Sequence, residues 1–289
     1  ATKRIDFVVT LKTPPTTVVK SNVIYNLDGV NVAITSDHYP LYCDFKKPTG
    51  LEEYPKAEGD LRIGNYFLTY CKGTDGVIDY DRTGRIIAKM NADIVCLQGL
   101  DKETERSEGI DQLNVLAQKA NMHDYFAKAI DYKGGEFGVG ILTKEEPVSV
   151  DRYQMAGKSE MRAAMVVEYE KFVVASTNFD TDMAKRIEAL QTLETKLSAY
   201  NKPAFLLGYF NEGDLESEFF QMVKSNWNLL SADKSTEVSG KKRRLDFIVS
   251  LKSHNVNVTQ ADVIESLSGV DVTVASTHYP LFCDFSGLK

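Results

Sequence analysis

The strand-rich end of the chain, residues 244–285, reads RLDFIVSLKSHNVNVTQADVIESLSGVDVTVASTHYPLFCDF. Residues 4–45, RIDFVVTLKTPPTTVVKSNVIYNLDGVNVAITSDHYPLYCDF, align with it without a gap, and 21 of the 42 positions are identical. The offset of 240 residues is much longer than the period of roughly 20–50 residues that builds solenoids and propellers. The repeat therefore indicates duplication of a whole domain.

This repeat predicts the domain organisation. We expect residues 1–46 to be the C-terminal segment of a preceding, truncated homologous domain, because so short a piece has too little core to fold alone. Residues 47–60 contain the Pro, Gly and charged residues typical of a linker. Residues 61–289 then form one complete domain. A start within the repeat also implies missing upstream sequence, which leaves the compartment open.

The composition is that of a globular protein with one large core. Of the 289 residues, 43% are hydrophobic and 26% are charged, which speaks against a disordered chain. No apolar run approaches the roughly 20 residues that span a membrane. The formal charge of −7 speaks against a protein that binds nucleic acid by neutralising phosphates, so we do not expect a nucleic-acid partner.

Strand and helix patterns alternate from Leu61 onward. Strand-rich ends around interspersed helices predict an α+β protein, a four-layer α/β/β/α sandwich in which two mixed sheets pack face to face with the helices outside. The expected strands are 65–71, 93–98, 125–130, 138–142, 162–168, 172–177 and 204–207, followed by those of the second repeat copy. The expected helices are 79–91, 110–120, 182–200 and 216–223.

The four cysteines, Cys43, Cys71, Cys96 and Cys283, show no close-spaced metal-binding pattern. Cys43 and Cys283 occupy the same position of the two repeats, within strand-like segments. Because free cysteine behaves as a small hydrophobic residue, we expect free thiols in the core.

A series of short motifs follows the chain from Leu61 to Lys289: TYC-KGTDG, DIVCLQG, GIDQL, GGEFGVGIL, SEMRAA, STNFD, LLGYFNE, RRLDFI and STHYP. In this order and at these spacings they closely resemble the deoxyribonuclease I-like endonuclease/exonuclease/phosphatase superfamily. The resemblance implies hydrolysis of phosphodiesters or phosphomonoesters with a divalent cation, usually Mg²⁺. In that chemistry a His-Asp pair and carboxylates move protons and orient water, while Asn and His stabilise the phosphate.

The motifs depart from the family at five polar positions. Where the family has Leu-Gln-Glu, with Glu as metal ligand, this chain has Leu97-Gln98-Gly99. The family's Tyr-Asn, Thr-His, Gly-Asp and Asp-His appear as Tyr70-Cys71, Thr177-Asn178, Gly208-Tyr209 and Thr277-His278. Without the aspartate before it, His278 is expected to lack the anion that holds its tautomer. Since loss of one member of a catalytic unit can cost several orders of magnitude, five losses argue against metal-dependent hydrolysis.

The resemblance marks Asn211, Asp246 and His278 as the vestige of a catalytic cleft. Arg162, Asn178 and Tyr209 are expected to line the same cleft for a phosphate or another ligand. We expect no metal ligands and no cofactor. Structural roles are the alternatives: Asp246 as part of a polar network in the core, and His278 as a hydrogen-bonding residue at the entry to the last strand.

The N-terminal repeat keeps one of the five residues that the complete domain has lost, the aspartate before the histidine. Its residues Arg4, Asp6, Asp37 and His38 match the closing motifs of the family. The resemblance therefore implies an Asp37–His38 catalytic dyad in the preceding domain.

Three hypotheses follow. The first is a catalytically degenerate domain from a tandem-domain protein, which supports an active upstream hydrolase domain or binds a partner. The alternative is a divalent-metal-dependent phosphodiesterase or phosphatase with a rearranged site around Asn211, Asp246 and His278, for which Mg²⁺ is the expected cofactor. The third concerns residues 1–46, which could exchange into a partner chain to form a swapped dimer and present Asp37 and His38 there.

Overall fold

The structure, a computed structural model, describes residues 8, 17–25, 38–46 and 53–289. It divides into two compact units, Ala1–Pro55 and Lys56–Lys289, which are described separately. Within the described residues, no helix is long and apolar enough to cross a membrane. Arg4, Asp6 and Asp37 lie outside the described residues, whereas His38 is described and exposed.

The second unit contains two six-stranded sheets. In spatial order, one sheet holds β13 (Asn257–Val263), β14 (Leu281–Ser286), β3 (Leu61–Phe67), β4 (Ile94–Lys102), β6 (Gly135–Thr143) and β5 (His123–Tyr132). The other holds β11 (Trp227–Leu229), β12 (Asp246–Leu251), β10 (Ala204–Tyr209), β9 (Val173–Asn178), β8 (Arg162–Glu168) and β7 (Ser149–Met155). Each sheet contains one parallel pair, β3–β4 or β9–β10, and is otherwise antiparallel.

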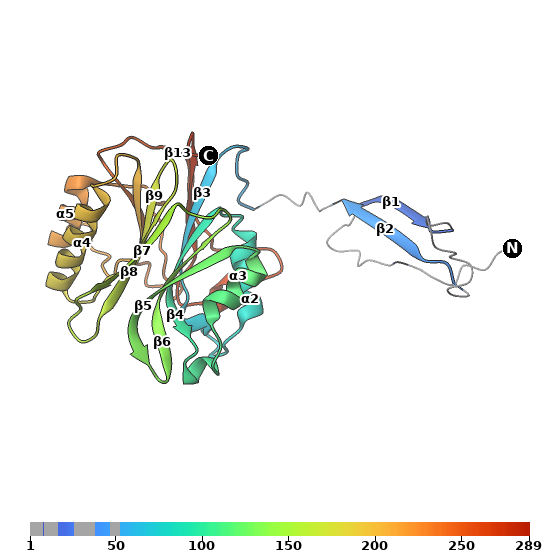
Figure 1. Cartoon of the computed structure of the whole chain (residues 1–289), viewed down its shortest axis with the longest axis horizontal. Coiled ribbons are helices and arrows are strands. Elements are labelled where there is room, and N and C mark those ends of the chain that lie inside the picture. Colours follow the sequence, from blue (N-terminus) through green and yellow to red (C-terminus); the bar gives the residue numbers. More distant parts are fainter. Residues whose placement is uncertain (1–7, 9–16, 26–37, 47–52) are drawn as a thin grey trace. The chain divides into compact units, whose positions relative to one another are not determined.

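Helices cover the outer faces of both sheets, so the predicted four-layer sandwich of two mixed sheets is confirmed (Figure 1). Figure 1 shows α4 and α5 outside one sheet, and α2 and α3 outside the other. Within the unit Lys56–Lys289, four of the five helices start at an aspartate whose side chain accepts a backbone N–H, as Asp79 does from Arg82. The helices are α2 (Tyr80–Lys89), α3 (Gln112–Ala120), α4 (Met183–Leu197), α5 (Glu218–Asn226) and the short α6 (Val272–Ala275).

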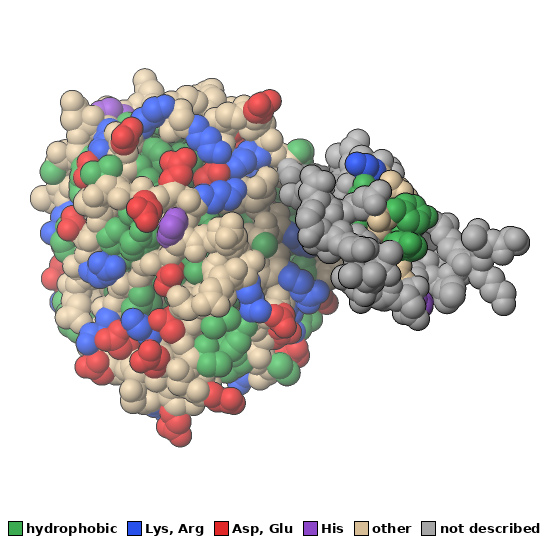
Figure 2. Space-filling view, turned by 45° about the vertical axis from the view of Figure 1, so that its right-hand side comes forward, with side chains coloured by type: hydrophobic (Ala, Val, Ile, Leu, Met, Phe, Trp, Pro, Cys, Tyr) green, Lys and Arg blue, Asp and Glu red, His purple; other side chains and the backbone are tan. Residues whose placement is uncertain are grey.

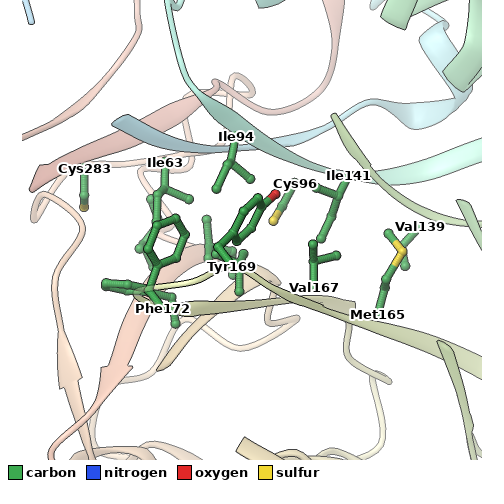
Figure 3. Close-up of a cluster of buried hydrophobic side chains, with 14 of the residues drawn as sticks. Ile63, Ile94, Cys96, Val139, Ile141, Met165, Val167, Tyr169, Phe172 and Cys283 are labelled. Carbon is green, nitrogen blue, oxygen red and sulfur yellow. The ribbon is translucent and has the colours of Figure 1, made fainter. Parts of the chain in front are cut away.

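Strand alternation divides the apolar residues between two cores. On β8, Met165 and Val167 point between the sheets, where Figure 3 shows them opposite Val139 and Ile141 of β6. The intervening Val166 packs in the second core, with side chains of α4 and α5. Successive side chains on a strand face opposite sides, so a strand buried on both faces reads as a nearly continuous apolar run.

The strand predicted at residues 65–71 is displaced. β3 covers Leu61–Phe67, and a 3₁₀ turn at Thr69–Cys71 follows it. Thr69, Tyr70 and Cys71 all have positive φ, between 48° and 60°, a conformation that is incompatible with a continuing strand. The segment was predicted as a strand because aromatic and apolar residues are typical of strands. The sequence also did not predict the half-exposed edge strand β7 or the short β11.

The described residues of the first unit include an antiparallel hairpin, β1 (Thr17–Val23) with β2 (Leu41–Lys46). Of the cysteines predicted to be buried, Cys71, Cys96 and Cys283 are buried and free, whereas Cys43 on β2 is only half-buried. The prediction for Cys43 was therefore wrong, because the sheet described around β2 has only two strands.

Candidate functional site

The sheet register brings the predicted cleft residues together at one end of the sandwich. Tyr209, the last residue of β10, lies opposite Asn178 on β9 and opposite Asp246 on β12. Asn211 follows two residues later, and its Nδ2 donates to Asn178 Oδ1 at 3.3 Å and to the Phe179 carbonyl at 2.7 Å. His278 joins the group from the loop before β14, with its ring centroid 4.7 Å from that of Tyr209.

Arg162 is engaged by carboxylates near this group. Its Nε donates to Asp180 Oδ2 at 3.0 Å, and its Nη1 donates to Glu160 Oε1 at 3.0 Å. Asp180 also accepts the backbone N–H groups of Lys158 and Asp182. These bonds hold Asp180 ionised, with its pKa lowered by hydrogen bonding and by Arg162 despite the opposing effect of burial. Arg162 therefore serves the loop structure next to the cleft.

The expectation that His278 lacks a carboxylate was wrong. Its Nδ1 lies 2.6 Å from Asp246 Oδ2, and the same oxygen accepts the Thr236 hydroxyl at 2.6 Å. Both His278 and Asp246 are buried. The two residues are 32 positions apart, so the missing aspartate beside His278 carried no information about this contact. A His-Asp pair therefore survives in the domain.

Thr277, which stands where the family has aspartate, belongs to a neutral hydroxyl cluster. Its Oγ1 lies 3.0 Å from Thr69 Oγ1, and the Ser276 hydroxyl donates to the Phe67 carbonyl at 2.6 Å. These bonds tie the loop before β14 to the end of β3. The cluster supplies no negative charge to the cleft.

Phe67 is the site residue that sequence reasoning missed. Because β3 ends at Phe67, the dipeptide at the end of this strand is Tyr66-Phe67, and the assignment of Tyr70-Cys71 to the family's Tyr-Asn was wrong. Cys71 lies beyond the strand, buried, where burial raises the pKa of its thiol. The structure identifies Phe67 through the pairing of β3 with β4, in which Phe67 lies opposite Gln98.

The ring of Phe67 occupies the space beside Gly99, where the family has its metal-binding glutamate. A Cβ added to Gly99 would lie 3.2 Å from Phe67 Cε2, and Gly99 has φ of +73°. The same ring lies 4.7 Å, centroid to centroid, from both Tyr209 and His278. Aromatic side chains therefore pack around His278 and leave it only 4% exposed.

The residues present do not fit a Mg²⁺ site. Such a cation takes about six oxygen ligands, most often from carboxylates and water. Among the described residues, no group of three or more His, Cys, Asp or Glu side chains is placed to hold a metal. Burial, with a smaller effect of Asp246, raises the pKa of Tyr209, so its phenol stays neutral at physiological pH. Asp246 Oδ2 is already shared by two hydrogen bonds.

Glu237 fixes the segment that supports the His-Asp pair. It accepts two hydrogen bonds from Arg243, at 2.6 and 2.7 Å, and it pairs with His278 in an isolated β-bridge. The Arg243 guanidinium lowers the pKa of Glu237 to about 2. A carboxyl group with a depressed folded-state pKa stabilises the fold above its unfolded-state pKa, and this contribution disappears as pH falls through the folded-state value.

Glu237→Gln is therefore expected to lower the free energy of unfolding at pH 7 by about 1 kcal/mol, since Arg243 is half exposed. The difference between wild type and variant should shrink between pH 5 and about pH 2, the range between the two pKa values of Glu237. Urea denaturation at four or five pH values measures this. A difference that stays constant down to pH 2 contradicts the assigned pKa.

No protein-family model and no curated protein matches the chain. Solved structures do. An endonuclease/exonuclease/phosphatase from Beutenbergia cavernae has a TM-score of 0.67 at 18% identity, over 80% of this chain and 73% of its own. A mannosyl-6-phosphatase from Bacteroides thetaiotaomicron has a TM-score of 0.61 at 15% identity, over 78% and 99%. The catalytic domain of human Nocturnin has a TM-score of 0.60 at 19% identity, over 80% and 96%. These likenesses confirm the predicted superfamily at the level of the fold.

Proposed function

Because the unit Lys56–Lys289 has the fold of the endonuclease/exonuclease/phosphatase superfamily, we propose that it is a catalytically inactive domain that binds a partner. The observation that carries this proposal is the ring of Phe67, which stands against Gly99 where a metal-binding glutamate is expected and packs on His278. An active site of this type needs a hard cation and a histidine that reaches the substrate. The Phe67 ring conflicts with both requirements, because it lies where the cation would bind and covers His278.

The accessibility of His278 supports the same conclusion. A general base must come within hydrogen-bond reach of the proton that it abstracts. His278 is buried and its ring packs against Phe67 and Tyr209, while Nδ1 is bonded to Asp246. The other ring nitrogen is therefore the one that a substrate would have to reach, on a side chain that is buried between two aromatic rings.

The surface favours a protein partner over nucleic acid. On the face of the second unit shown in Figure 2, acidic and basic side chains are interspersed and form no continuous basic field. The basic run Lys241–Arg244 is partly neutralised, because Arg243 pairs with Glu237 and Arg244 with Asp233. With a net charge of −7, such a surface suits binding to a protein, such as the upstream hydrolase domain proposed from the repeat, more than to a phosphate backbone.

One observation favours a second candidate, a phosphodiesterase or phosphatase with a rearranged site. The His278–Asp246 pair has the short contact of an oriented acid–base dyad, 2.6 Å. Asn211 donates to Asn178, and both Asn178 and Asp246 lie opposite Tyr209 in the sheet. In this alternative His278 acts as the general base, Asp246 orients it, and Asn211 contacts the phosphate. Mg²⁺ would have to bind through residues other than those that the family uses.

A hydrolysis assay separates the two candidates. The full chain is incubated with bis(p-nitrophenyl) phosphate and with p-nitrophenyl phosphate, each with Mg²⁺ and with Mn²⁺, beside the variants His278→Ala and His123→Ala. His123 is an exposed histidine on β5 and serves as the matched control. We expect all three proteins to give the uncatalysed rate. Metal-dependent turnover that falls by a factor of about 100 or more only in His278→Ala would establish the second candidate.

A further inference from the structure

The N-terminal hairpin β1–β2 reproduces the C-terminal hairpin β13–β14 residue for residue. Leu41 pairs with Val23 as Leu281 pairs with Val263, and every other partner in the register is shifted by the same 240 positions. Both ladders even contain the same irregularity, between Val18 and Lys20 in one and between Val258 and Gln260 in the other. A bulge is a specific structural feature of a strand pair, so the two segments fold to the same hairpin.

The bonds that close the two hairpins also correspond. Ile24 N donates to the Pro40 carbonyl at 2.7 Å, and Ile264 N donates to the Pro280 carbonyl at 2.8 Å. Val23 N donates to Asn22 Oδ1 at 2.9 Å, and Val263 N donates to Asp262 Oδ1 at 2.8 Å. The hairpin conformation is therefore encoded locally in the repeat.

The two hairpins differ in what covers them. β14 pairs on one side with β13 and on the other with β3, and its residues Leu281, Phe282 and Cys283 are completely buried. The corresponding residues 41–43 are only half-buried, and the sheet described around β2 has two strands. Val8 is 46% exposed, whereas its counterpart Ile248 is completely buried. Among the described residues, the N-terminal copy thus has the apolar residues of a sheet interior without the cover that the C-terminal copy has.

The chemistry that attaches β14 to β3 is specific. Arg62 on β3 donates to both carboxylate oxygens of Asp284, at 2.6 and 2.7 Å, in a pair that is buried on both sides. Its guanidinium carbon lies 3.9 Å from the centre of the Phe282 ring. β2 has the sequence LYCDFK where β14 has LFCDFS. β2 therefore retains the aspartate as Asp44, and an aromatic residue again stands two positions before it in the sequence.

We propose that β1–β2 is a second closing hairpin, and that its partner is the core of a homologous domain of this fold whose own closing hairpin is absent or displaced. The partner is recognised by a β3-type edge strand that carries an arginine at the position of Arg62, to pair with Asp44. Docking by strand addition would supply the main-chain bonds, and the Arg–Asp pair would set the register. It would also bring Asp37-His38 to the place that Thr277-His278 occupies here.

Stoichiometry selects this partner over a swapped dimer of the chain itself. Each chain carries two closing hairpins and one described β3 strand. If two copies exchanged their N-terminal hairpins, each would release its β13–β14 hairpin, so each described core would still hold only one closing hairpin. Replacing one hairpin by its copy on the same β3 strand buries no additional apolar surface. A separate homologous core, in contrast, would bury the apolar residues of β1–β2.

The full chain can test this proposal, because its own core has the required β3 strand. Asp284→Ala removes the carboxylate from β14 but leaves Asp44 on β2 as a replacement partner for Arg62. We expect β1–β2 then to displace β13–β14. Limited proteolysis with mass spectrometry should show more cleavage within residues 257–286 and less within residues 17–46 than in the wild type.

Melting temperatures of a double-mutant cycle give the second readout. Asp44→Ala alone should leave Tm unchanged, as should the control Glu58→Ala, which removes an exposed carboxylate. In the Asp284→Ala background, Asp44→Ala should lower Tm by a further amount of about 5 °C. If Asp284→Ala does not fold, the same cycle of melting temperatures is measured with the milder variant Asp284→Asn. Equal effects of Asp44→Ala in both backgrounds, with no change in the cleavage pattern, would overturn the proposal.

Discussion

Replacing Arg62 by alanine is expected to lower the free energy of unfolding by about 3–5 kcal/mol. Arg62 is completely buried, and its guanidinium bonds to both oxygens of Asp284 and to the Met90 carbonyl. Removing it leaves the Asp284 carboxylate buried without its cation, which costs more than the ion pair contributes. Because neither closing hairpin can replace Arg62, exchange of hairpins cannot rescue this variant.

Urea denaturation followed by circular dichroism measures this effect. Arg85→Ala, which removes an exposed arginine from α2, is the matched control and should change stability by at most about 0.5 kcal/mol. The double variant Arg62→Met/Asp284→Leu removes both charges and should recover much of the loss. A loss below about 1 kcal/mol for Arg62→Ala would contradict the buried pair as the anchor of β14.

Gly99→Glu, which places the family's ligand back in its position, is expected to cost about 3 kcal/mol. Gly99 has φ of +73°, and its new Cβ would lie 3.2 Å from Phe67 Cε2. The backbone strain and the contact with the ring add to each other. Phe67→Asn alone should also destabilise, because its ring packs on Tyr209 and His278.

The double variant Phe67→Asn/Gly99→Glu should be more stable than the sum of the single changes predicts, by about 1–2 kcal/mol. The smaller asparagine removes the clash that the glutamate meets. Urea denaturation of the four proteins measures this coupling, and Gly109→Glu is the control for backbone strain, since Gly109 has φ of +74° with nothing near its Cβ position. Strict additivity would show that Phe67 does not occupy the place of the glutamate.

A structural role explains why a His-Asp pair would persist in a domain that we propose to be inactive. Asp246 at the start of β12 binds both His278 and Thr236. The Thr236 carbonyl in turn accepts the backbone N–H of Tyr279, the residue that follows His278. Loss of either partner would leave a buried polar group unsatisfied. The pair therefore joins the segment around Thr236 to the start of β14.

The superfold and most element positions were predictable from the sequence. Apolar periodicity identified α2, α3 and α4 within two or three residues at each end, and Asp79 and Asp182 cap their helices. The strands β9 and β10 were found as apolar runs, because a strand that is buried on both faces has apolar residues at nearly every position. Local spacing encodes these features, so one sequence suffices to find them. The boundary at Phe67 was missed because the left-handed turn at Thr69–Cys71 has no glycine to mark it.

The fold, the order of the motifs and the repeat shared by the two hairpins could all be predicted from the sequence, because these depend on local pattern and on internal comparison. The three-dimensional structure was needed to show that His278 keeps a carboxylate, which Asp246 supplies from another strand, and that Phe67 lies where a metal ligand was expected. Both facts depend on which residues the sheet register brings opposite one another. A one-residue change of register turns every side chain of a strand to the other face, so a site built from several strand ends is fixed only when those strands are paired.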